Sequence, residues 1–318
     1  MTFFTTSCAV YPKRVLLSML FLILLGCGVD EAQEPASETD RSLSPRQQAN
    51  IEREKLASVE SQLEQIERDV LAAVRAGDRI RAKQLIDVGL RIVEERGPGF
   101  ELNQARLILA AGNIEREAGN EIEARRHFDD AMAIFHVHKD KKGRVETYIA
   151  LGQLETRRGD YVAASRQFAA AEALMPELAD RRLPGVFNLN IGRLASRQLK
   201  REQAYKHYVE AIRIFSNSKD KQDMAETLLL LASEEDAMGR TRASKRSIEK
   251  ALRVFRNIED MDGEARSLHR LAVLAERDKN YGRAKKLLLK VHDLYDKLDR
   301  KTAATRVMRH INALPVEK

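Results

Sequence analysis

The sequence predicts an all-α fold, and three observations support this prediction. Charged residues make up 32% of the 318 residues and apolar residues 43%. Prolines number only seven. This balance supplies enough apolar side chains for a core and favours helices. Five positions also recur at a 40-residue step. An internal repeat of this length indicates a stack of helical units, in which each unit buries one face against its neighbour.

The first element is an apolar run at residues 15–25, VLLSMLFLILL, which follows Lys13 and Arg14. A membrane-spanning helix needs about 20 apolar residues. A buried core helix is not expected directly before an acidic, polar stretch. Positive charges followed by a short apolar core and small residues are typical of a signal peptide. The end of the run, LLGC at residues 24–27, resembles the bacterial lipobox, in which an aliphatic, a variable and a small residue precede cysteine.

The lipobox resemblance implies that residues 1–26 are removed as a lipoprotein signal peptide and that Cys27 carries the lipid. Two or three acyl chains hold a protein on a membrane, since each buried methylene contributes about 0.8 kcal/mol. Gly28 stands where an aspartate would favour the inner membrane. We therefore expect a lipid-anchored protein of the cell envelope, at the outer membrane and facing the periplasm. Residues 27–44 are interpreted as the lipidated cysteine and a disordered acidic tether.

Residues 45–318 are the predicted repeat domain, which begins with a long helix. Ser44 and Pro45 are typical of a helix start. The apolar residues of this helix recur at steps of three and four, which places them on one face. They are Leu56, Val59, Leu63, Ile66 and Val70. This face can pack on the repeats, or it can pair with a second copy of the chain in a homodimer.

The recurring positions define columns of small and large residues. The first column is Gly112, Gly152, Gly192, Ala232 and Ala272. The second is Ala124, Ala164, Ala204, Ser244 and Ala284, and the third is Phe128, Phe168, Tyr208, Ile248 and Leu288. The fourth is Ala131, Ala171, Ala211, Ala251 and Val291, and each unit closes with Phe135, Met175, Phe215, Phe255 or Tyr295. Small residues let antiparallel helices approach closely, and large ones fill the gap between neighbouring pairs.

Between the first and second columns the first helix of each unit must end in a turn. Gly119, Gly159 and Gly239 stand there and suit a left-handed conformation. Leu199 and Lys279 take this place in two other units, so their turns are expected to be less favourable.

These columns and turns resemble the tetratricopeptide repeat (TPR), which has a small residue in its first helix, a glycine turn, and Ala, Phe and Ala in its second. The common unit has 34 residues. The resemblance implies a right-handed TPR-like α-solenoid of about six helix pairs plus a C-terminal capping helix. The expected units lie near residues 51–95, 101–137, 144–176, 184–217, 220–257 and 260–297. The expected cap is 299–314, with Ala303, Val307 and Ile311 on its apolar side.

Motifs for catalysis or for a cofactor are absent from the sequence. It has no glycine-rich phosphate loop, no G-x-S-x-G and no H-E-x-x-H. His136 and His138 are two residues apart, which points them to different sides of a helix. We therefore expect no enzyme, no catalytic residue, no metal and no cofactor.

The charge of the chain restricts its partners. The formal net charge is +7, and a basic domain often binds nucleic acid. An address in the periplasm excludes that partner. Lipid headgroups, wall polymers and acidic protein segments remain as anionic partners. The alternative is a mixed charged surface that keeps the helices soluble.

Three hypotheses of function follow. The first is a membrane-anchored protein–protein interaction scaffold or adaptor in the bacterial envelope, with an assembly, pilotin-like or wall-enzyme adaptor role. The second is a protein or enzyme that acts on wall or lipid polymers through its basic surface. The third is a cytoplasmic TPR regulator, if the lipobox is fortuitous.

The TPR resemblance also implies a binding groove along the first helices of the units. The predicted groove residues are Ile149, Gln153, Arg157, Leu189, Asn190, Arg193 and Arg197. An apolar row, Leu109, Ile149, Leu189 and Leu229, would run beside the polar groups. Because the arginine fork suits carboxylates, we expect an envelope protein with an acidic and apolar segment as the partner. The alternative is that these arginines pair with Glu146, Glu155 or Asp236.

Overall fold

The computed structural model describes residues 45–218 and 220–315. This part of the chain contains thirteen α-helices, one short 3-10 helix and no strand. The predicted all-α class is therefore confirmed. The predicted signal peptide, Cys27 and the tether lie outside the described residues. The helical repeats lie in one compact unit that begins at residue 53.

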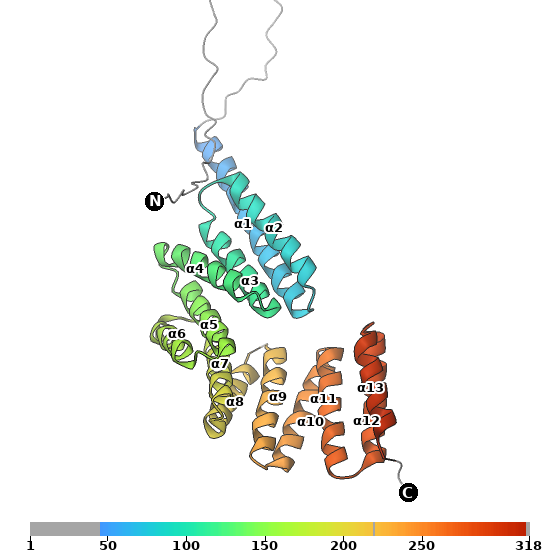
Figure 1. Ribbon diagram of the computed structural model, residues 1–318. Helices are drawn as coiled ribbons and strands as arrows, with labels where there is room; N and C mark the ends of the chain where they lie inside the picture. The colour runs from blue at the N-terminus through green and yellow to red at the C-terminus, as the bar shows by residue number, and fades with distance from the viewer. Residues whose placement is uncertain (1–44, 219, 316–318) are drawn as a thin grey trace, which may run out of the picture. The chain divides into compact units, whose positions relative to one another are not determined.

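The helices follow one another as consecutive pairs (Figure 1). The pairs are α1 (Pro45–Arg75) with α2 (Arg79–Arg96), α3 (Glu101–Ala118) with α4 (Glu121–Val137), α5 (Lys141–Arg158) with α6 (Tyr161–Leu174), α7 (Leu183–Arg197) with α8 (Arg201–Ser216), α9 (Lys221–Ala237) with α10 (Thr241–Asn257), and α11 (Met261–Arg277) with α12 (Tyr281–Lys297). The 3-10 helix η1 (Met175–Glu177) follows α6, and α13 (Lys301–Ala313) follows the last pair. From α3 onward, the helices of a pair pack on each other and each pair packs on the next. This is the TPR-like α-solenoid that the columns predict.

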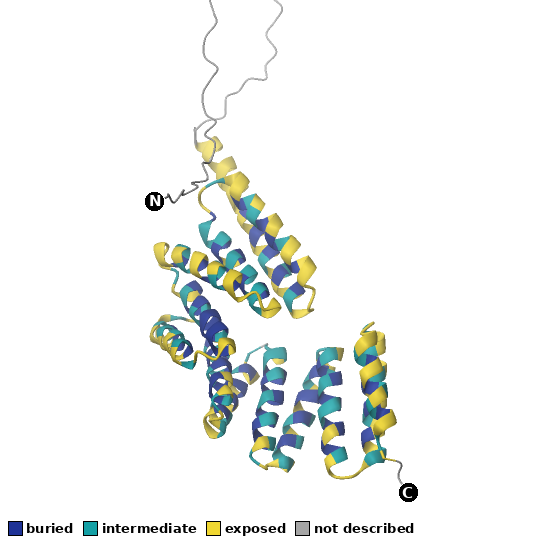
Figure 2. Cartoon of the chain, in the orientation of Figure 1, coloured by how far each residue is buried: buried dark blue, intermediate teal, exposed yellow. Residues whose placement is uncertain are grey.

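The core of the repeats is built from the predicted columns. Every residue of the second, third and fourth columns is buried, from Ala124 to Val291. The glycines and alanines of the first column are buried as well. Figure 2 shows the buried face of each helix turned toward its neighbours. Because each unit packs only on adjacent units, one column pattern is enough to specify the whole stack.

Helix α1 packs on the repeats along most of the predicted face. Val59, Leu63, Ile66 and Val70 are buried, whereas Leu56 is exposed. The buried residues form two clusters with apolar residues of α2, α3 and the segment between them. The prediction of packing is therefore confirmed for residues 59–70, and pairing with a second copy stays a prediction.

The closing helix α13 has a slightly different apolar face from the one predicted. Ala304, Val307 and Ile311 are buried, and Ala303 is only half-buried. Ala303 lies at the edge of this face, because two steps of four drift around a helix with 3.6 residues per turn. Steps of three and then four keep residues 304, 307 and 311 in line.

The turns between paired helices have the predicted left-handed residues. Gly119, Gly159 and Gly239 have φ values of 89°, 82° and 74°. Leu199 and Lys279 adopt the same region, each with φ of 59°. Side chains with a β-carbon rarely occupy this region, so these two turns store backbone strain.

None of the helices in residues 45–218 and 220–315 is both long and apolar enough to cross a membrane.

Candidate functional site

Helices α5 and α7, the first helices of two consecutive units, carry the predicted groove residues. The Asp140 carboxylate begins α5 by accepting a hydrogen bond from the Gly143 N–H at 3.2 Å. Pro184 stands in the first turn of α7, where its missing N–H costs no helical hydrogen bond. Steps of three and four residues then place Gln153 and Arg157 on one face of α5. The same steps place residues 190, 193 and 197 on one face of α7.

The predicted apolar row is part of the core and offers a partner almost no surface. Ile149 is 3% exposed and Leu189 is 6% exposed, and Leu109 and Leu229 are also buried. Ile149 packs with residues of α6 and α7, and Leu189 packs with residues of α9. Neighbouring units approach closely enough to cover most of the row, although Leu109 and Ile149 also line the larger cavity described below. Contact of this row with a partner stays a prediction.

Gln153 and Asn190 connect the two helices. Gln153 Nε2 donates a hydrogen bond to Asn190 Oδ1 at 2.9 Å. Asn190 Nδ2 donates to the Val186 carbonyl oxygen at 2.7 Å, which fixes the orientation of the amide. Asn190 is buried, whereas Gln153 is half-buried. The pair therefore forms a rigid polar floor between two units of the solenoid.

Four arginines gather above this floor, in a site that we name the arginine pocket. Arg116 of α3, Arg157 of α5, and Arg193 and Arg197 of α7 line a cavity of about 290 Å³. Arg157 Nη1 donates to the carbonyl oxygen of Arg116 at 2.5 Å, and Arg193 Nη1 donates to Asn190 Oδ1 at 3.4 Å. The rest of the wall consists of Gln153, Thr156, Asn190, Ser196, Tyr208, Phe168 and Leu230. The structure therefore brings together five of the seven predicted groove residues.

The three predicted arginines have no acidic partner in the described part of the chain. No ion pair there joins Arg157, Arg193 or Arg197 to a carboxylate. The acids considered as partners lie beside other cations. Glu155 pairs with Arg125 and Arg158, and Asp236 pairs with Arg277 at 2.6 Å. Lys142 is the cation that most favours the charged form of Glu146. The structure thus differs from the alternative in which these arginines only neutralise nearby acids.

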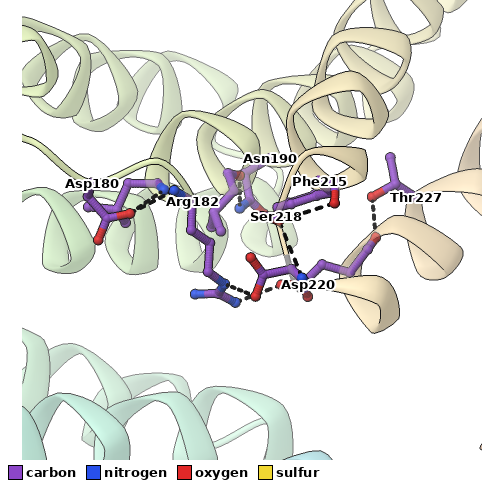
Figure 3. A network of polar contacts seen from close by, with 10 residues as sticks. Asp180, Arg182, Asn190, Phe215, Ser218, Asp220 and Thr227 are labelled. Atoms are coloured by element: carbon purple, nitrogen blue, oxygen red, sulfur yellow. Dashed lines mark hydrogen bonds and ion pairs between the residues drawn. The ribbon is translucent and has the colours of Figure 1, made fainter. Parts of the chain in front are cut away.

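Other arginines at the first helices are held by acids of a neighbouring unit. Arg182 donates to Asp220 at 3.1 Å and to Asp223 at 2.7 Å, and Figure 3 shows it reaching from the start of α7 toward Asp220. Arg266 donates to Glu226 across α9 and α11 at 2.5 Å. Pairing between units is thus common on this face, and the arginine pocket departs from it.

Arg116 is the buried member of the pocket. Its side chain is 15% exposed, and Nη2 donates to Asn113 Oδ1 at 3.3 Å. Burial lowers the pKa of the Arg116 guanidinium to about 10, the Glu117 carboxylate opposes this shift, and Arg157 and Arg193 add to it. Its Nε atom is buried without a hydrogen-bond partner in the structure. Glu117 lies 3.9 Å from Arg116, so among the described residues the pocket charge left without an ion pair is that of Arg157, Arg193 and Arg197.

A larger cavity adjoins the arginine pocket, and we name it the apolar cavity. It has a volume of about 540 Å³ and is lined by Val70 and Val74 of α1, Leu107 and Ala110 of α3, and other residues of α5 and α7. Gln153 and Arg116 line both cavities. The two cavities together form one groove along α3, α5 and α7, apolar at one end and basic at the other.

Four carboxylate residues line the apolar cavity, namely Glu67, Glu117, Asp140 and Glu146, and two of them have shifted pKa values. Burial raises the pKa of Glu67 and of Glu146 above the ordinary value, and Asn103 and Lys142 respectively oppose the shift. Glu67 accepts a hydrogen bond from Asn103 Nδ2 at 2.9 Å. Glu146 faces the cavity edge near Lys142, which itself lies 3.0 Å from Asp180. These groups give the apolar cavity a polar margin.

The sequence identified three of the pocket arginines and missed Arg116. The residue 40 positions before Arg157 is Glu117. The column that contains Arg157 and Arg197 therefore predicts an acidic residue in α3. Arg116 occupies the column of Thr156 and Ser196 instead. No signal in the columns distinguishes Arg116 from a surface arginine, because its role depends on the offset between α3 and α5.

Nowhere in the described ranges do three or more His, Cys, Asp or Glu side chains form a group that could hold a metal ion. The chemistry that the groove offers is therefore hydrogen bonding and charge recognition.

Comparisons with known proteins agree with the fold. Residues 103–177 match the family model of the tetratricopeptide repeat. No curated protein matches the chain in sequence. Among solved structures, the chain is similar to a signal transduction ATPase with numerous domains that carries a tetratricopeptide repeat sensor, from Pyrococcus horikoshii. The TM-score is 0.64 at 16% identity, covering 78% of this chain and 37% of that one. The chain thus spans little more than a third of that protein's length.

Two Rap proteins have the same arrangement of helices. One is a Rap protein complexed with Competence and Sporulation Factor, with a TM-score of 0.59 at 12% identity over 77% of this chain and 72% of that one. The other is the Rap conjugation gene regulator of the plasmid pLS20 in complex with a Phr peptide. Its TM-score is 0.59 at 14% identity over 90% of this chain and 83% of that one. At these identities the likeness defines a fold class, the TPR-like α-solenoid.

Proposed function

We propose that this chain is a protein–protein interaction adaptor that holds an acidic segment of its partner in the groove of α3, α5 and α7. The observation that carries the proposal is the group of arginines without acidic partners, Arg157, Arg193 and Arg197, on the inner helices of a TPR-like solenoid. Guanidinium groups bind carboxylates through two parallel hydrogen bonds. A partner that supplies carboxylates would neutralise charge that the adaptor leaves open.

The groove accommodates a short segment better than a folded surface. Its two cavities are about 290 and 540 Å³, which is the size range of sites for small ligands and side chains. Two solved neighbours of this fold are complexes with a signalling factor or a peptide, which supports a segment as occupant. We infer that apolar residues of the partner lie in the apolar cavity and acidic residues in the arginine pocket.

The proposed adaptor works at a membrane surface. The proposal rests on the LLGC sequence at residues 24–27 and on the polar stretch 28–44 that follows it. A lipid on Cys27 would hold the repeat domain at the outer membrane, where the partner is an envelope protein. Assembly, pilotin-like and wall-enzyme adaptor roles all fit this arrangement.

The test is recovery of the partner from crosslinked membranes. Wild-type protein should retain a partner that the double variant Arg193→Glu with Arg197→Glu loses, while helicity and melting temperature stay unchanged. The matched control is Arg242→Glu with Arg246→Glu in α10, because both side chains are exposed and have the same spacing. If the groove variant retains the partner as well as the control does, the binding site lies elsewhere.

The same preparations test action on wall polymers. Hydrolysis of peptidoglycan by purified protein, or salt-sensitive binding to it without any protein partner, would replace the adaptor proposal.

A further inference from the structure

The arginine pocket contains a buried hydrogen-bond donor that the chain does not satisfy. Arg116 Nε has no acceptor, although buried polar atoms in folded proteins are nearly always paired. The Arg116 carbonyl oxygen is already occupied by Arg157. The nearest carboxylate is that of Glu117, whose oxygen lies 3.9 Å from Arg116 Nη2. The Arg116 side chain is 15% exposed and lines the pocket, so a ligand there can contact the accessible part of this side chain.

The polar side chains between the arginines do not supply such an acceptor. Thr156 Oγ1 donates to the Gly152 carbonyl oxygen at 2.7 Å, and Ser196 Oγ donates to the Glu234 carboxylate at 2.5 Å. Glu234 also lies 3.4 Å from Arg201, so its charge is shared with a cation outside the pocket. The lining hydroxyl groups are therefore engaged with the protein, and the guanidinium groups remain available to a ligand.

We propose that the arginine pocket binds one compact group that carries two negative charges. Four guanidinium groups from α3, α5 and α7 converge on a cavity of about 290 Å³, and one carboxylate would leave most of their charge unpaired. Two neighbouring carboxylates or one phosphate supply at least three acceptor oxygens in a small volume. This inference rests on the proposed adaptor function, since it names the chemistry that the partner segment presents.

The position of the four arginines explains why the group must be compact. Gln153 and Asn190 close the floor of the pocket through their 2.9 Å hydrogen bond. Phe168, Tyr208 and Leu230 contribute the remaining wall. Arg193 and Arg197 are exposed and line the same cavity as Arg116, so a compact group inside it lies near all of them. The lowered pKa of Arg116 agrees with this, because an anion nearby would raise that pKa again.

The direct test is thermal unfolding of the full-length protein in detergent with inorganic phosphate, succinate or acetate at equal ionic strength. A ligand that binds only the folded state raises the melting temperature in a saturable way. Phosphate and succinate should do so, and acetate should require at least tenfold higher concentration. Circular dichroism is the suitable readout, because the chain has no tryptophan.

Variants separate the site from general salt effects, since phosphate also stabilises proteins by exclusion from their surface. Arg197→Gln and Arg116→Gln should each weaken the saturable response at least tenfold, and Arg242→Gln in α10 should leave it unchanged. Arg197 is exposed, so its variant keeps the test valid if Arg116→Gln does not fold. Equal responses in wild-type protein and both pocket variants would overturn the proposal.

Peptides then identify the source of the charge. A peptide with two adjacent glutamates, a phosphoserine peptide, and the same peptide with glutamines are compared by isothermal titration. Binding of either charged peptide, lost in Arg197→Gln, supports the proposal and names the source. If partner capture succeeds but no dianion binds, this inference fails and the adaptor function stands. If dianions bind and no partner is captured, the adaptor function fails and the inference of a dianion site stands.

Discussion

The ring of Phe168 lies so close to Gly152 that a β-carbon on this glycine would meet Cε1 of the ring at 2.6 Å. The same relationship joins Gly112 to Phe128 at 2.6 Å. It recurs between Gly192 and Tyr208, again at 2.6 Å. The first and third columns of the sequence therefore act together. A glycine in the first helix of a pair leaves room for an aromatic ring from the second helix.

The first prediction concerns this contact. Gly152→Ala should destabilise the protein by about 1–3 kcal/mol, the usual cost of overpacking a core. The loss should occur although alanine favours a helix over glycine by about 1 kcal/mol. Denaturant unfolding followed by circular dichroism measures it.

The matched variants for this contact reduce the ring. Phe168→Leu alone should also destabilise, because it leaves a cavity. The double variant Gly152→Ala with Phe168→Leu should lose less than the sum of the two, since the smaller side chain leaves room for the methyl group. A more stable Gly152→Ala protein would show that the helices do not approach in this way.

The fold could be predicted from sequence because its contacts are local and repeated. The glycines and rings of one unit touch each other or the adjacent unit, so a 40-residue step in the sequence corresponds to a step in space. The groove was harder to predict. Ile149 is on the expected helix face, yet α7 covers it, and a single-helix projection contains no information on the distance to the next helix.

Arg116 illustrates the same limit within the pocket. Its neighbour Glu117 holds the column position of Arg157, so a column analysis predicts an acid where the structure has a buried arginine. The offset between α3 and α5 depends on how the helices pack. The place of Arg193 and Arg197 in the pocket could be predicted, because both lie on one face of α7 at a spacing of four residues.

The second prediction concerns the left-handed turn at Leu199. Its φ of 59° costs a residue with a β-carbon about 1–2 kcal/mol. Leu199→Gly should therefore stabilise the protein by about 0.5–1 kcal/mol, after the larger entropy loss of glycine on folding is subtracted. The side chain is 71% exposed, so its removal loses little packing. Denaturant unfolding measures the change.

Gly159 provides the reciprocal control for this turn. It has φ of 82°, and a β-carbon there would have no atom within 4 Å. Gly159→Leu should destabilise through the backbone alone, by about 1–2 kcal/mol. If both substitutions leave stability unchanged, the turns do not carry the strain that their φ values indicate.

The third prediction concerns the membrane anchor. Mass spectrometry of the mature protein should find Cys27 at the amino terminus with acyl groups attached, because lipid modification of LLGC precedes cleavage before the cysteine. Cys27→Ser should release the protein from membranes or leave it uncleaved. Cys8→Ser changes the other cysteine and should have no effect. Wild-type protein recovered from the cytosol with Met1 present would contradict the anchor.

The fourth prediction concerns pH and begins with the contact between α11 and α13. The rings of His269 and His310 lie 6.0 Å apart between centroids, and His310 Nε2 lies 3.0 Å from the Glu276 carboxylate. Burial lowers the pKa of His269, the charges of His310 and Arg270 lower it further, and Glu276 opposes them. The folded state therefore keeps His269 neutral at pH values where the unfolded chain binds a proton.

This difference sets the direction of the pH effect. Between the ordinary histidine pKa of about 6.5 and the lower folded value, the unfolded state holds more protons, so stability falls as pH decreases. Glu67 and Glu146 have raised pKa values, so above the ordinary glutamate range the folded state holds more protons than the unfolded chain. These two groups therefore increase stability as the pH decreases. The contribution of His269 must therefore be measured as a difference between variants. His269→Gln should reduce the loss of unfolding free energy between pH 7.5 and 5.5.

The control is His136→Gln, which changes an exposed histidine at the end of α4. It should retain the wild-type pH dependence, because this side chain lies outside the contact between α11 and α13. Denaturant unfolding at several pH values compares the three proteins. The difference between wild type and His269→Gln should appear as the pH falls below about 6.5, where the unfolded histidine gains its proton. Parallel curves for wild type and His269→Gln across this range would mean that protonation of His269 is not coupled to unfolding of the C-terminal helices.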